Sequence, residues 1–489
     1  MKNIIVLGGG TAGLVAAITL KQSFPNYSIK VVESDSVGII GVGEGSTEHW
    51  RRFAEYCKID IRELVRETDA ALKKGIKFEN WNGDGNSYFH SLGHLFFPYN
   101  DPVNTNEFVK TLVVENIKAE DVLVDTSLIE HNAGLFTVNQ YHFNTFKLNA
   151  YLHKLCERRG IEIVEDTIKD VVLSSNGDVE HIVGNLGIHS ADFFVDSSGF
   201  KRIIASKLGA KFISYKKYLP MNHALAFPTN DVSDLKPYTL SRALSSGWNW
   251  RISTQGRYGN GYVFCDDFMD STKAHDEVQS FYSEEVKVAK DIKFEAGRVD
   301  RFWINNCVSI GLSASFVEPL EASSIGNSIL QALSLCEMLE DWFNDRKVSE
   351  IYDKLFIRCY DNIVDFIQLH YITKRNDTEF WRALPSMMTQ TDFIKDNLEH
   401  FKKCMPSQHY FTGKSNMFNA PNWAQVMAGL DLYDKEHMRK CLLETHGPNV
   451  IQEQLAKYEE YLTQVQKQSY IDHKVLLQQN NIVVKFERN

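Results

Sequence analysis

Short apolar runs alternate with amphipathic stretches at the beginning of the chain. Residues 4–7 (IIVL) form a continuous apolar run of the length typical of a buried parallel strand. Residues 14–24 (LVAAITLKQSF) have apolar positions at helical spacing, and residues 29–34 (IKVVES) form a second apolar run. Because a strand, a helix and another strand follow one another closely, the pattern predicts a βαβ unit with two parallel strands.

Further strands are predicted over the first two thirds of the chain, and helices after them. From about Gly326 onward apolar residues recur every three or four positions, as in SILQALSLCEMLEDWF. The sequence therefore predicts an α/β fold in two parts, an α/β domain over residues 1–330 and a mainly helical module over residues 331–489. The strand candidates are residues 161–166, 181–187, 192–198, 261–266 and 307–312.

Composition and charge narrow the class of protein. The chain has 489 residues, 43% of them hydrophobic and 24% charged, which is typical of a globular protein. The formal net charge of −10 argues against nucleic-acid binding, which needs a concentrated basic face. No apolar run is long enough to span a bilayer. Eight scattered cysteines without CxxC spacing indicate reduced thiols and a cytoplasmic protein.

A glycine-rich turn follows the first predicted strand. In GGGTAG, residues 8–13, the glycines at positions 8, 10 and 13 fit GxGxxG, with Thr11 and Ala12 between the last two. Such a turn brings backbone close to a pyrophosphate at a helix N-terminus. Glu33 ends the second strand 20 positions after Gly13, where it can accept hydrogen bonds from an adenosine ribose. The sequence therefore predicts a dinucleotide site.

Two small-residue segments favour FAD over NAD as the dinucleotide. Residues 38–47 (GIIGVGEGST) and 195–199 (VDSSG) would let backbone lie against an extended cofactor. No second GxGxxG is present, so a built-in NAD(P)H domain is not evident. His90 and His94 lie four positions apart, but without a third ligand or an HExxH pattern they do not predict a metal site.

Six segments in the same order resemble those of the flavin-dependent halogenases of the tryptophan halogenase type. Each is a weak signal alone, and the set is specific. The resemblance extends from residue 3 to about residue 430. The segments are GGGTAG, GVGEG (41–45), KKGIKFENW (73–81), GWNW (247–250), NNCVSIGLSASFVEPLE (305–321) and HYITKRNDTEFW (370–381).

The resemblance implies an FAD-binding, Rossmann-like domain of the aromatic hydroxylase type with a mainly helical substrate module. It also implies that a separate flavin reductase supplies reduced FAD transiently. Reduced FAD, oxygen and a halide ion then give hypohalous acid, which reaches a lysine beside a small aromatic substrate. The missing NAD(P)H motif agrees with this scheme. The resemblance does not decide whether the protein is a homo-oligomer.

Three lysines stand close together in KKGIKFENW, and the resemblance selects one of them. The family's catalytic amine corresponds to Lys73, whereas composition alone would place Lys73, Lys74 and Lys77 in one solvated basic strip. The family's catalytic glutamate corresponds to Glu321. Glu318, three residues earlier, is expected to be a structural or surface acid.

The resemblance also assigns residues around the flavin and the halide. Halide would be held by the backbone amides of Ser323 and Ser324. Ala322 and Ser324 replace the family's serine and glycine, and serine adopts positive φ less freely than glycine. If these replacements weaken chloride binding, the pocket would prefer bromide or iodide. The residues expected near the cofactor are Gly45, Ile168 through its backbone, Leu312, Ile325, Trp248 and Trp250.

The substrate side departs from family members that take free tryptophan. His90 matches a histidine that stacks on the indole, and Phe418 lies in the corresponding lid segment. Leu92 replaces an aromatic residue, and Lys414 and Ser415 replace the acid-rich part of the lid. We therefore expect an indole or phenol without the amino-acid head. Two alternatives stay open, an FAD-dependent aromatic monooxygenase (hydroxylase) and a non-catalytic FAD-binding protein.

Overall fold

The computed structural model describes residues 2–34, 38, 44–91, 102–118, 128–130, 140–230, 234–413, 416–467 and 470–479. The chain folds as two compact units, each made of three segments. The first unit comprises residues 1–70, 140–216 and 294–361, and the second comprises residues 71–139, 217–293 and 362–489. The predicted boundary at residue 330 falls inside helix α10 (Ser323–Asn344) and inside the first unit. The difference arises because both units collect elements from distant parts of the chain.

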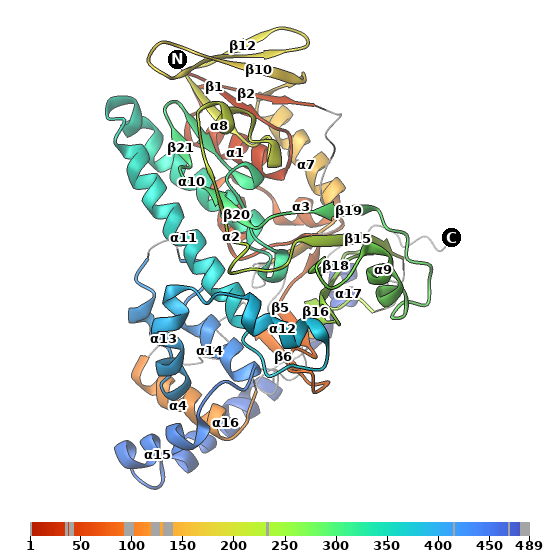
Figure 1. The fold of residues 1–489 in the computed structure, drawn as a ribbon, viewed down its shortest axis with the longest axis vertical. Coiled ribbons are helices and arrows are strands. Elements are labelled where there is room, and N and C mark those ends of the chain that lie inside the picture. Colours follow the sequence, from red (N-terminus) through yellow and green to blue (C-terminus); the bar gives the residue numbers. More distant parts are fainter. Residues whose placement is uncertain are drawn as a thin grey trace. The chain divides into compact units, whose positions relative to one another are not determined.

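A six-stranded sheet forms the centre of the first unit (Figure 1). The first two strands are parallel and are joined by α1 (Thr11–Ser23), so the predicted βαβ unit is confirmed. Leu7 pairs with Asp196 on one side and with Val32 on the other, which brings the ends of three strands to the glycine-rich turn. The order is β21 (Trp303–Ile304), β22 (Cys307–Ser309), β13 (Phe193–Asp196), β1 (Asn3–Leu7), β2 (Ser28–Glu33) and β9 (Glu162–Glu165), with only β21 antiparallel to its neighbour.

Helices and small sheets complete the first unit. Helix α1 is buried along most of its length and packs against α10 and α7 (Thr145–Arg158). Ile5, Leu7 and Val32 belong to a core cluster that continues into a neighbouring hairpin. The remaining elements are α2 (His49–Tyr56), α3 (Ile61–Glu67), α8 (Ile203–Lys207), β3 (Glu44–Gly45) paired with β8 (Tyr141–Phe143), β10 (Ile168–Leu173) with β11 (Val179–Gly184) and β12 (Ile188–Ser190), and β14 (Phe212–Ser214) with β20 (Gly297–Val299) and β23 (Ser315–Phe316).

A seven-stranded sheet forms the centre of the second unit. All neighbouring strands are antiparallel except β16 and β5. Buried aromatic and aliphatic side chains on β15 and β18 pack against α9 (Ser271–Gln279). The order is β19 (Lys290–Lys293), β15 (His223–Thr229), β18 (Tyr258–Phe264), β17 (Gly247–Ser253), β16 (Thr239–Ala243), β5 (Gly75–Glu79) and β6 (Ser87–Ser91).

The rest of the second unit is mainly helical, as the pattern after residue 326 predicts. A short strand pair, β24 (Tyr470–Asp472) with β7 (Leu128–Glu130), interrupts the helices and was not predicted. The helices are α4 (Pro102–Val114), the C-terminal part of α11 (Val348–His370), α12 (Glu379–Met387), α13 (Asp392–Lys403), α14 (Ala420–Gly429), α15 (Lys435–His446), α16 (Val450–Gln466) and α17 (His473–Gln479).

The strand predictions are confirmed with shifted ends. Residues 161–166, 192–198 and 307–312 contain β9, β13 and β22 of the parallel sheet, and residues 181–187 overlap β11. Residues 261–266 overlap β18, which lies in the antiparallel sheet of the second unit.

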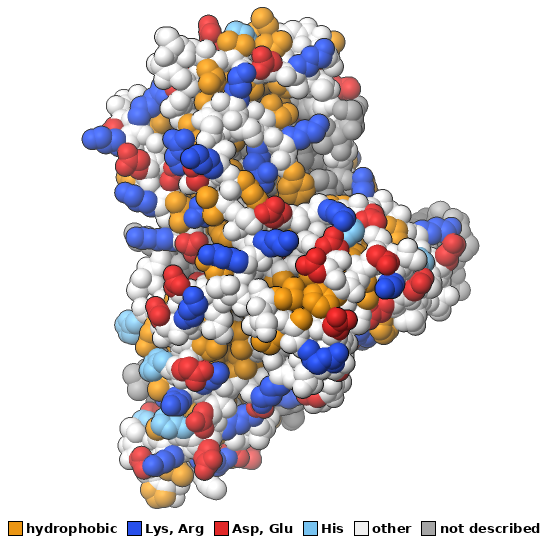
Figure 2. Space-filling view, viewed as in Figure 1, with side chains coloured by type: hydrophobic (Ala, Val, Ile, Leu, Met, Phe, Trp, Pro, Cys, Tyr) orange, Lys and Arg blue, Asp and Glu red, His pale blue; other side chains and the backbone are white. Residues whose placement is uncertain are grey.

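Four general features of the described residues bear on function. No helix among them is long and apolar enough to cross a membrane. They contain no group of three or more His, Cys, Asp or Glu side chains that could hold a metal ion, and all eight cysteines, which lie in the described ranges, are free thiols. On the face in Figure 2, Lys and Arg side chains are interspersed with Asp and Glu.

Candidate active site

The glycine-rich turn has the geometry that a bound dinucleotide requires. Gly8 has φ of +118°, where a side chain is strained, and a Cβ at Gly8 or Gly13 would overlap backbone or side-chain atoms. A Cβ at Gly10 would meet nothing within 4 Å. No side chain caps the N-terminus of α1 at Gly10, and its first turn carries no acid. The turn is therefore tight where it packs on protein and open where a pyrophosphate would approach.

Glu33 lies directly beside this turn. A Cβ on Gly9 would overlap the Glu33 carboxylate, so the absence of a side chain at Gly9 allows the two to touch. The Glu33 side chain is 20% exposed, and both of its carboxylate oxygens lie 3.0 Å from Nε2 of His153. The acid is therefore held at the mouth of the predicted nucleotide site.

The other residues predicted near the cofactor belong to the first unit, with Gly45 buried in β3. Ile168 begins β10, and its partly buried side chain packs on the core cluster. A Cβ on Gly311, which has φ of +68°, would press on Ala12 at the start of α1. Leu312 follows Gly311, and Ile325 is buried in the first turn of α10. Residues 39–43 of the small-residue segment lie outside the described residues.

The predicted glutamate and halide segments meet at the N-terminus of α10. Glu321 ends a short 3-10 helix, η4 (Pro319–Glu321), and is fully buried. Glu318 is 1% exposed, so of the two expected roles, a structural or a surface acid, only the structural one agrees with its position, and burial does not distinguish the two glutamates. Ala322 adopts a left-handed conformation with φ of 54° and gives α10 no side-chain cap.

This geometry corrects the backbone argument at Ser324. Ser324 lies in the first turn of α10 and has a helical conformation, so it does not require positive φ. The residue in the left-handed region is Ala322, which lies between the end of η4 and the start of α10. Ser323 is buried and Ser324 is exposed.

The three lysines of the second unit differ in burial. Lys73 is 1% exposed and lies between β4 (Ala71–Leu72) and β5. Lys74 is only half-buried, and Lys77 pairs with Glu79 at 3.3 Å in a partly exposed position. Lysine is almost never fully buried unless it is paired. The hypothesis of a solvated basic strip is therefore wrong for Lys73. The partial exposure of Lys74 and Lys77 agrees with it.

Hydrogen bonds fix the backbone on both sides of Lys73. The Lys74 N–H donates to the Pro237 carbonyl at 2.7 Å. The Leu72 N–H donates to Nε2 of His473 at 3.0 Å, and Nδ1 of His473 lies 3.2 Å from the Leu235 carbonyl. Burial lowers the pKa of His473 to about 4, and the positive charge of Lys74 acts in the same direction. A neutral imidazole from the C-terminal helix α17 therefore anchors the lysine segment.

The two tryptophans of GWNW lie on β17 and contact each other. Their ring centroids are 6.1 Å apart, in line with the shared face of alternate strand residues. The Trp248 indole N–H donates to the Tyr371 hydroxyl at 3.1 Å. Gly261, the partner of Trp250 across the sheet, leaves the space that the Trp250 ring fills. Ser253, which replaces the family's proline, donates its hydroxyl to the Lys236 carbonyl.

The predicted substrate residues His90 and Phe418 both contact the ring of Phe366. Phe366 of α11 stacks on Phe418 at 4.1 Å and contacts the His90 ring at 5.4 Å. Asn362 pairs with both backbone groups of Phe418, at 2.8 and 2.9 Å. The amide of Asn422 lies 3.1 Å from Nε2 of His90. Leu92, His94, Lys414 and Ser415 lie outside the described residues.

Sequence reasoning missed these supporting residues. One sequence signal could have identified Phe366: it stands four residues before His370, on the same face of the helix. The contacts of Asn362, Asn422 and His473 join segments far apart in the sequence, so no local pattern signals them.

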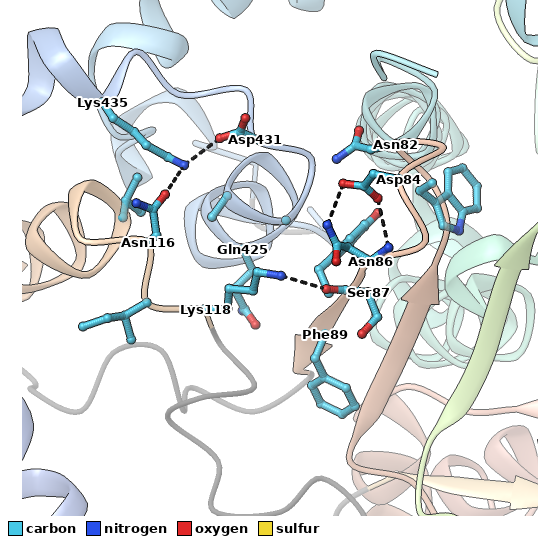
Figure 3. A pocket seen from close by; sticks show the side chains of 16 residues that line it. Asn82, Asp84, Asn86, Ser87, Phe89, Asn116, Lys118, Gln425, Asp431 and Lys435 are labelled. Atoms are coloured by element: carbon cyan, nitrogen blue, oxygen red, sulfur yellow. Dashed lines mark hydrogen bonds and ion pairs between the residues drawn. The ribbon is translucent and has the colours of Figure 1, made fainter. Parts of the chain in front are cut away.

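A polar surface cavity of about 270 Å³ lies elsewhere in the second unit (Figure 3). It is lined by the end of the β5–β6 hairpin, by α14 and by residues after α4. Lys435 in this cavity bonds to Asp431 and Asn116, both at 2.6 Å. None of the predicted site residues lines it.

Comparison with known proteins places the chain among halogenases. A tryptophan halogenase family model matches residues 3–443. The chain is 31% identical over 445 residues to 7-chloro-L-tryptophan 6-halogenase KtzR of Kutzneria sp. (strain 744), covering 83% of this chain and 85% of that protein.

Two solved structures have a similar fold. Tryptophan halogenase from Shewanella frigidimarina NCIMB 400 is alike in fold, with a TM-score of 0.88 at 24% identity, covering 98% of this chain and 97% of that one. The flavin-dependent halogenase BrvH from Brevundimonas sp. BAL3 has a TM-score of 0.82 at 25% identity, covering 98% of this chain and 99% of that one. On the length of the family match and the retained sequence segments, this chain belongs to the tryptophan halogenase family.

Proposed function

We propose that this protein is a flavin-dependent halogenase that transfers halogen through Lys73 to an aromatic substrate of the indole or phenol type. The observation that carries the proposal is the burial of Lys73, next to two lysines that remain partly exposed. A buried amine exchanges little with water, so it can hold a reactive species at one fixed point. Family membership supplies the reaction class.

The residues of the first unit fit an FAD cofactor. The glycine-rich turn and the N-terminus of α1 would hold the pyrophosphate, and Glu33 would accept hydrogen bonds from the adenosine ribose. Ile168, Leu312 and Ile325 remain proposed contacts further along the cofactor. FAD, supplied in its reduced form by a separate flavin reductase, provides the electrons with which oxygen and halide give hypohalous acid.

Lys73 would hold hypohalous acid by a hydrogen bond or as a haloamine. In the transfer, the halogen forms a bond to an aromatic carbon and its bond to oxygen or to the lysine nitrogen breaks. The ring then loses a proton, for which we propose Glu321 as the acceptor, and water is released overall. The position of the amine relative to the substrate would decide which carbon reacts.

The halide would be bound by the backbone amides of Ser323 and Ser324 at the start of α10. Helix N-termini attract anions, and Ala322 contributes no side-chain cap that would compete with the halide. Ser324 adds volume and a hydroxyl where the family has glycine. We propose that bromide or iodide is used in preference to chloride, because both are desolvated and oxidised more easily.

Two features support an aromatic substrate. His90 and Phe418 both contact the Phe366 ring, and Trp248 and Trp250 form a further aromatic pair in the same unit. The lid segment lacks the acid that would pair with the ammonium of free tryptophan. Free tryptophan should therefore be a poorer substrate than indole.

The test is product analysis by mass spectrometry. The protein is incubated with FAD, a flavin reductase, NADH, each halide in turn, and a panel of indoles and phenols that includes free tryptophan. We expect halogenated product that disappears in Lys73→Ala, while Lys74→Ala, which changes the neighbouring lysine, keeps it. Product from Lys73→Ala within a few-fold of wild type would overturn the lysine assignment.

The same experiment separates the alternatives. Hydroxylated product, or NADPH consumption without a reductase, would identify an aromatic monooxygenase. FAD binding with no product from any member of the panel would identify a non-catalytic flavoprotein.

A further inference from the structure

Two side chains of α7 reach the predicted nucleotide site. The side-chain amide of Asn149 donates to the Gly9 carbonyl at 2.8 Å. His153, one turn further along the same helix face, places Nε2 3.0 Å from each carboxylate oxygen of Glu33. Helix α7 therefore contacts both the glycine-rich turn and the acid that ends β2.

The hydrogen bonds of His153 require a proton on each ring nitrogen. Nδ1 lies 2.9 Å from the Asn149 carbonyl, and Nε2 faces the Glu33 carboxylate. Both partners are acceptors only, so an imidazolium makes both bonds and a neutral ring makes one. The bond to Glu33 raises the pKa of His153 and outweighs the effect of burial, while Glu157 of α7 is the other nearby charge with the same influence.

We propose that His153 is a positioning residue for FAD, whose imidazolium fixes the Glu33 carboxylate in the orientation that receives the adenosine ribose. The proposal rests on the proposed FAD cofactor and extends it to a residue outside the glycine motif. A carboxylate has about four acceptor sites, so Glu33 keeps capacity for ribose hydroxyls after bonding to His153. The imidazolium also offsets a negative charge that would otherwise stand close to the pyrophosphate.

An ordinary surface ion pair would look similar in isolation, and two observations argue against it here. The His153 and Glu33 side chains are only 25% and 20% exposed. The same helix face makes a second contact, from Asn149 to Gly9 in the glycine-rich turn. Asn149 is only 8% exposed. Lys154, the next residue of α7, forms an exposed pair with Glu67 at 3.0 Å and provides a matched comparison.

The test measures FAD affinity directly, with flavin fluorescence or calorimetry on protein stripped of cofactor. Wild type, His153→Gln and Lys154→Gln are compared from about pH 6, near the ordinary pKa of histidine, up to about pH 9, because a raised pKa moves the loss of the proton to higher pH. Gln keeps an N–H donor but carries no charge and does not titrate. Melting temperatures of the stripped proteins report whether each variant folds.

We expect the wild-type Kd for FAD to increase as pH rises, because His153 loses its proton. At about pH 6, His153→Gln should bind FAD roughly tenfold more weakly than wild type, as expected when the hydrogen bond to Glu33 loses the positive charge of its donor, and its Kd should not depend on pH. Lys154→Gln should match wild type at every pH. If His153→Gln fails to fold, the test is the pH dependence of the wild-type Kd for FAD, together with the Kd of Asn149→Ala.

Two results have different meanings. FAD binding by His153→Gln with the wild-type affinity and pH profile would overturn this inference and leave the proposed cofactor intact. A wild-type protein that does not bind FAD at any pH would instead overturn the proposed function.

Discussion

Acidification should release the segment that anchors Lys73, through one buried histidine. His473 accepts the Leu72 N–H with Nε2 while Nδ1 faces the Leu235 carbonyl. The bond from Leu72 requires the neutral ring, because an imidazolium cannot accept a hydrogen bond, whereas Nδ1–H can donate to Leu235 in either protonation state. Protonation would leave a buried amide without its partner and would place a second positive charge beside Lys74.

The size of the effect follows from proton linkage. The pKa of His473 is lowered from 6.5 to about 4 in the folded protein. Because the opened state binds the proton more tightly, the neutral ring contributes its full stability above about pH 6.5 and loses it as pH falls toward about pH 4. The whole shift corresponds to about 3 kcal/mol, of which about 2 kcal/mol is lost by about pH 5.

Hydrogen exchange measured by mass spectrometry would detect this loss in the peptide that covers residues 470–479. The opening free energy, corrected for the intrinsic pH dependence of exchange, is compared between about pH 7.5 and about pH 5. Wild type should lose about 2 kcal/mol more than His473→Gln, which cannot titrate. His437→Gln, which removes a half-buried histidine of α15, should retain the wild-type dependence.

Equal losses in wild type and His473→Gln would refute the reasoning. That outcome would mean either that His473 is already protonated near neutral pH or that it does not limit the opening of this segment.

The remaining predictions concern the cofactor, the proton acceptor and the halide. Gly10→Val should abolish FAD binding, measured by fluorescence, without lowering the melting temperature, since a Cβ there meets no protein atom. Glu321→Gln should slow product formation strongly while hypohalous acid still bleaches a scavenger dye; if only Glu318→Gln has this effect, the proton-acceptor role moves to Glu318. Ala322→Ser with Ser324→Gly should shift product toward chloride in competition with bromide, and a wild type that makes mainly chlorinated product would contradict the halide proposal.

Local sequence determined the βαβ unit of the first compact unit, with its glycine-rich turn. The apolar run at residues 4–7, the glycines at 8, 10 and 13, and Glu33 are contiguous or nearly so, and a βαβ unit fixes their mutual positions by short-range geometry. The segments that resemble the halogenase family indicated the class of reaction from local sequence too, because each segment is a short run of residues and the segments follow in the family's order.

The tertiary structure decided what neighbouring residues of the same type do. Lys73 and Lys74 are adjacent in sequence, and only the packing around β4 and β5 buries the first and leaves the second partly exposed. Packing likewise buried Glu318 as well as Glu321, which leaves only the structural one of the two roles expected for Glu318, and placed the left-handed residue at Ala322. Burial depends on chain segments that are distant in sequence, so local patterns do not encode it.

The same reason explains the histidines that the sequence did not reveal. His473 reaches Leu72 across 401 positions, and His153 reaches Glu33 across 120. A histidine carries no periodic or spacing signal of its own, so its protonation and its role follow only from the acceptors and donors that folding brings to its two nitrogens.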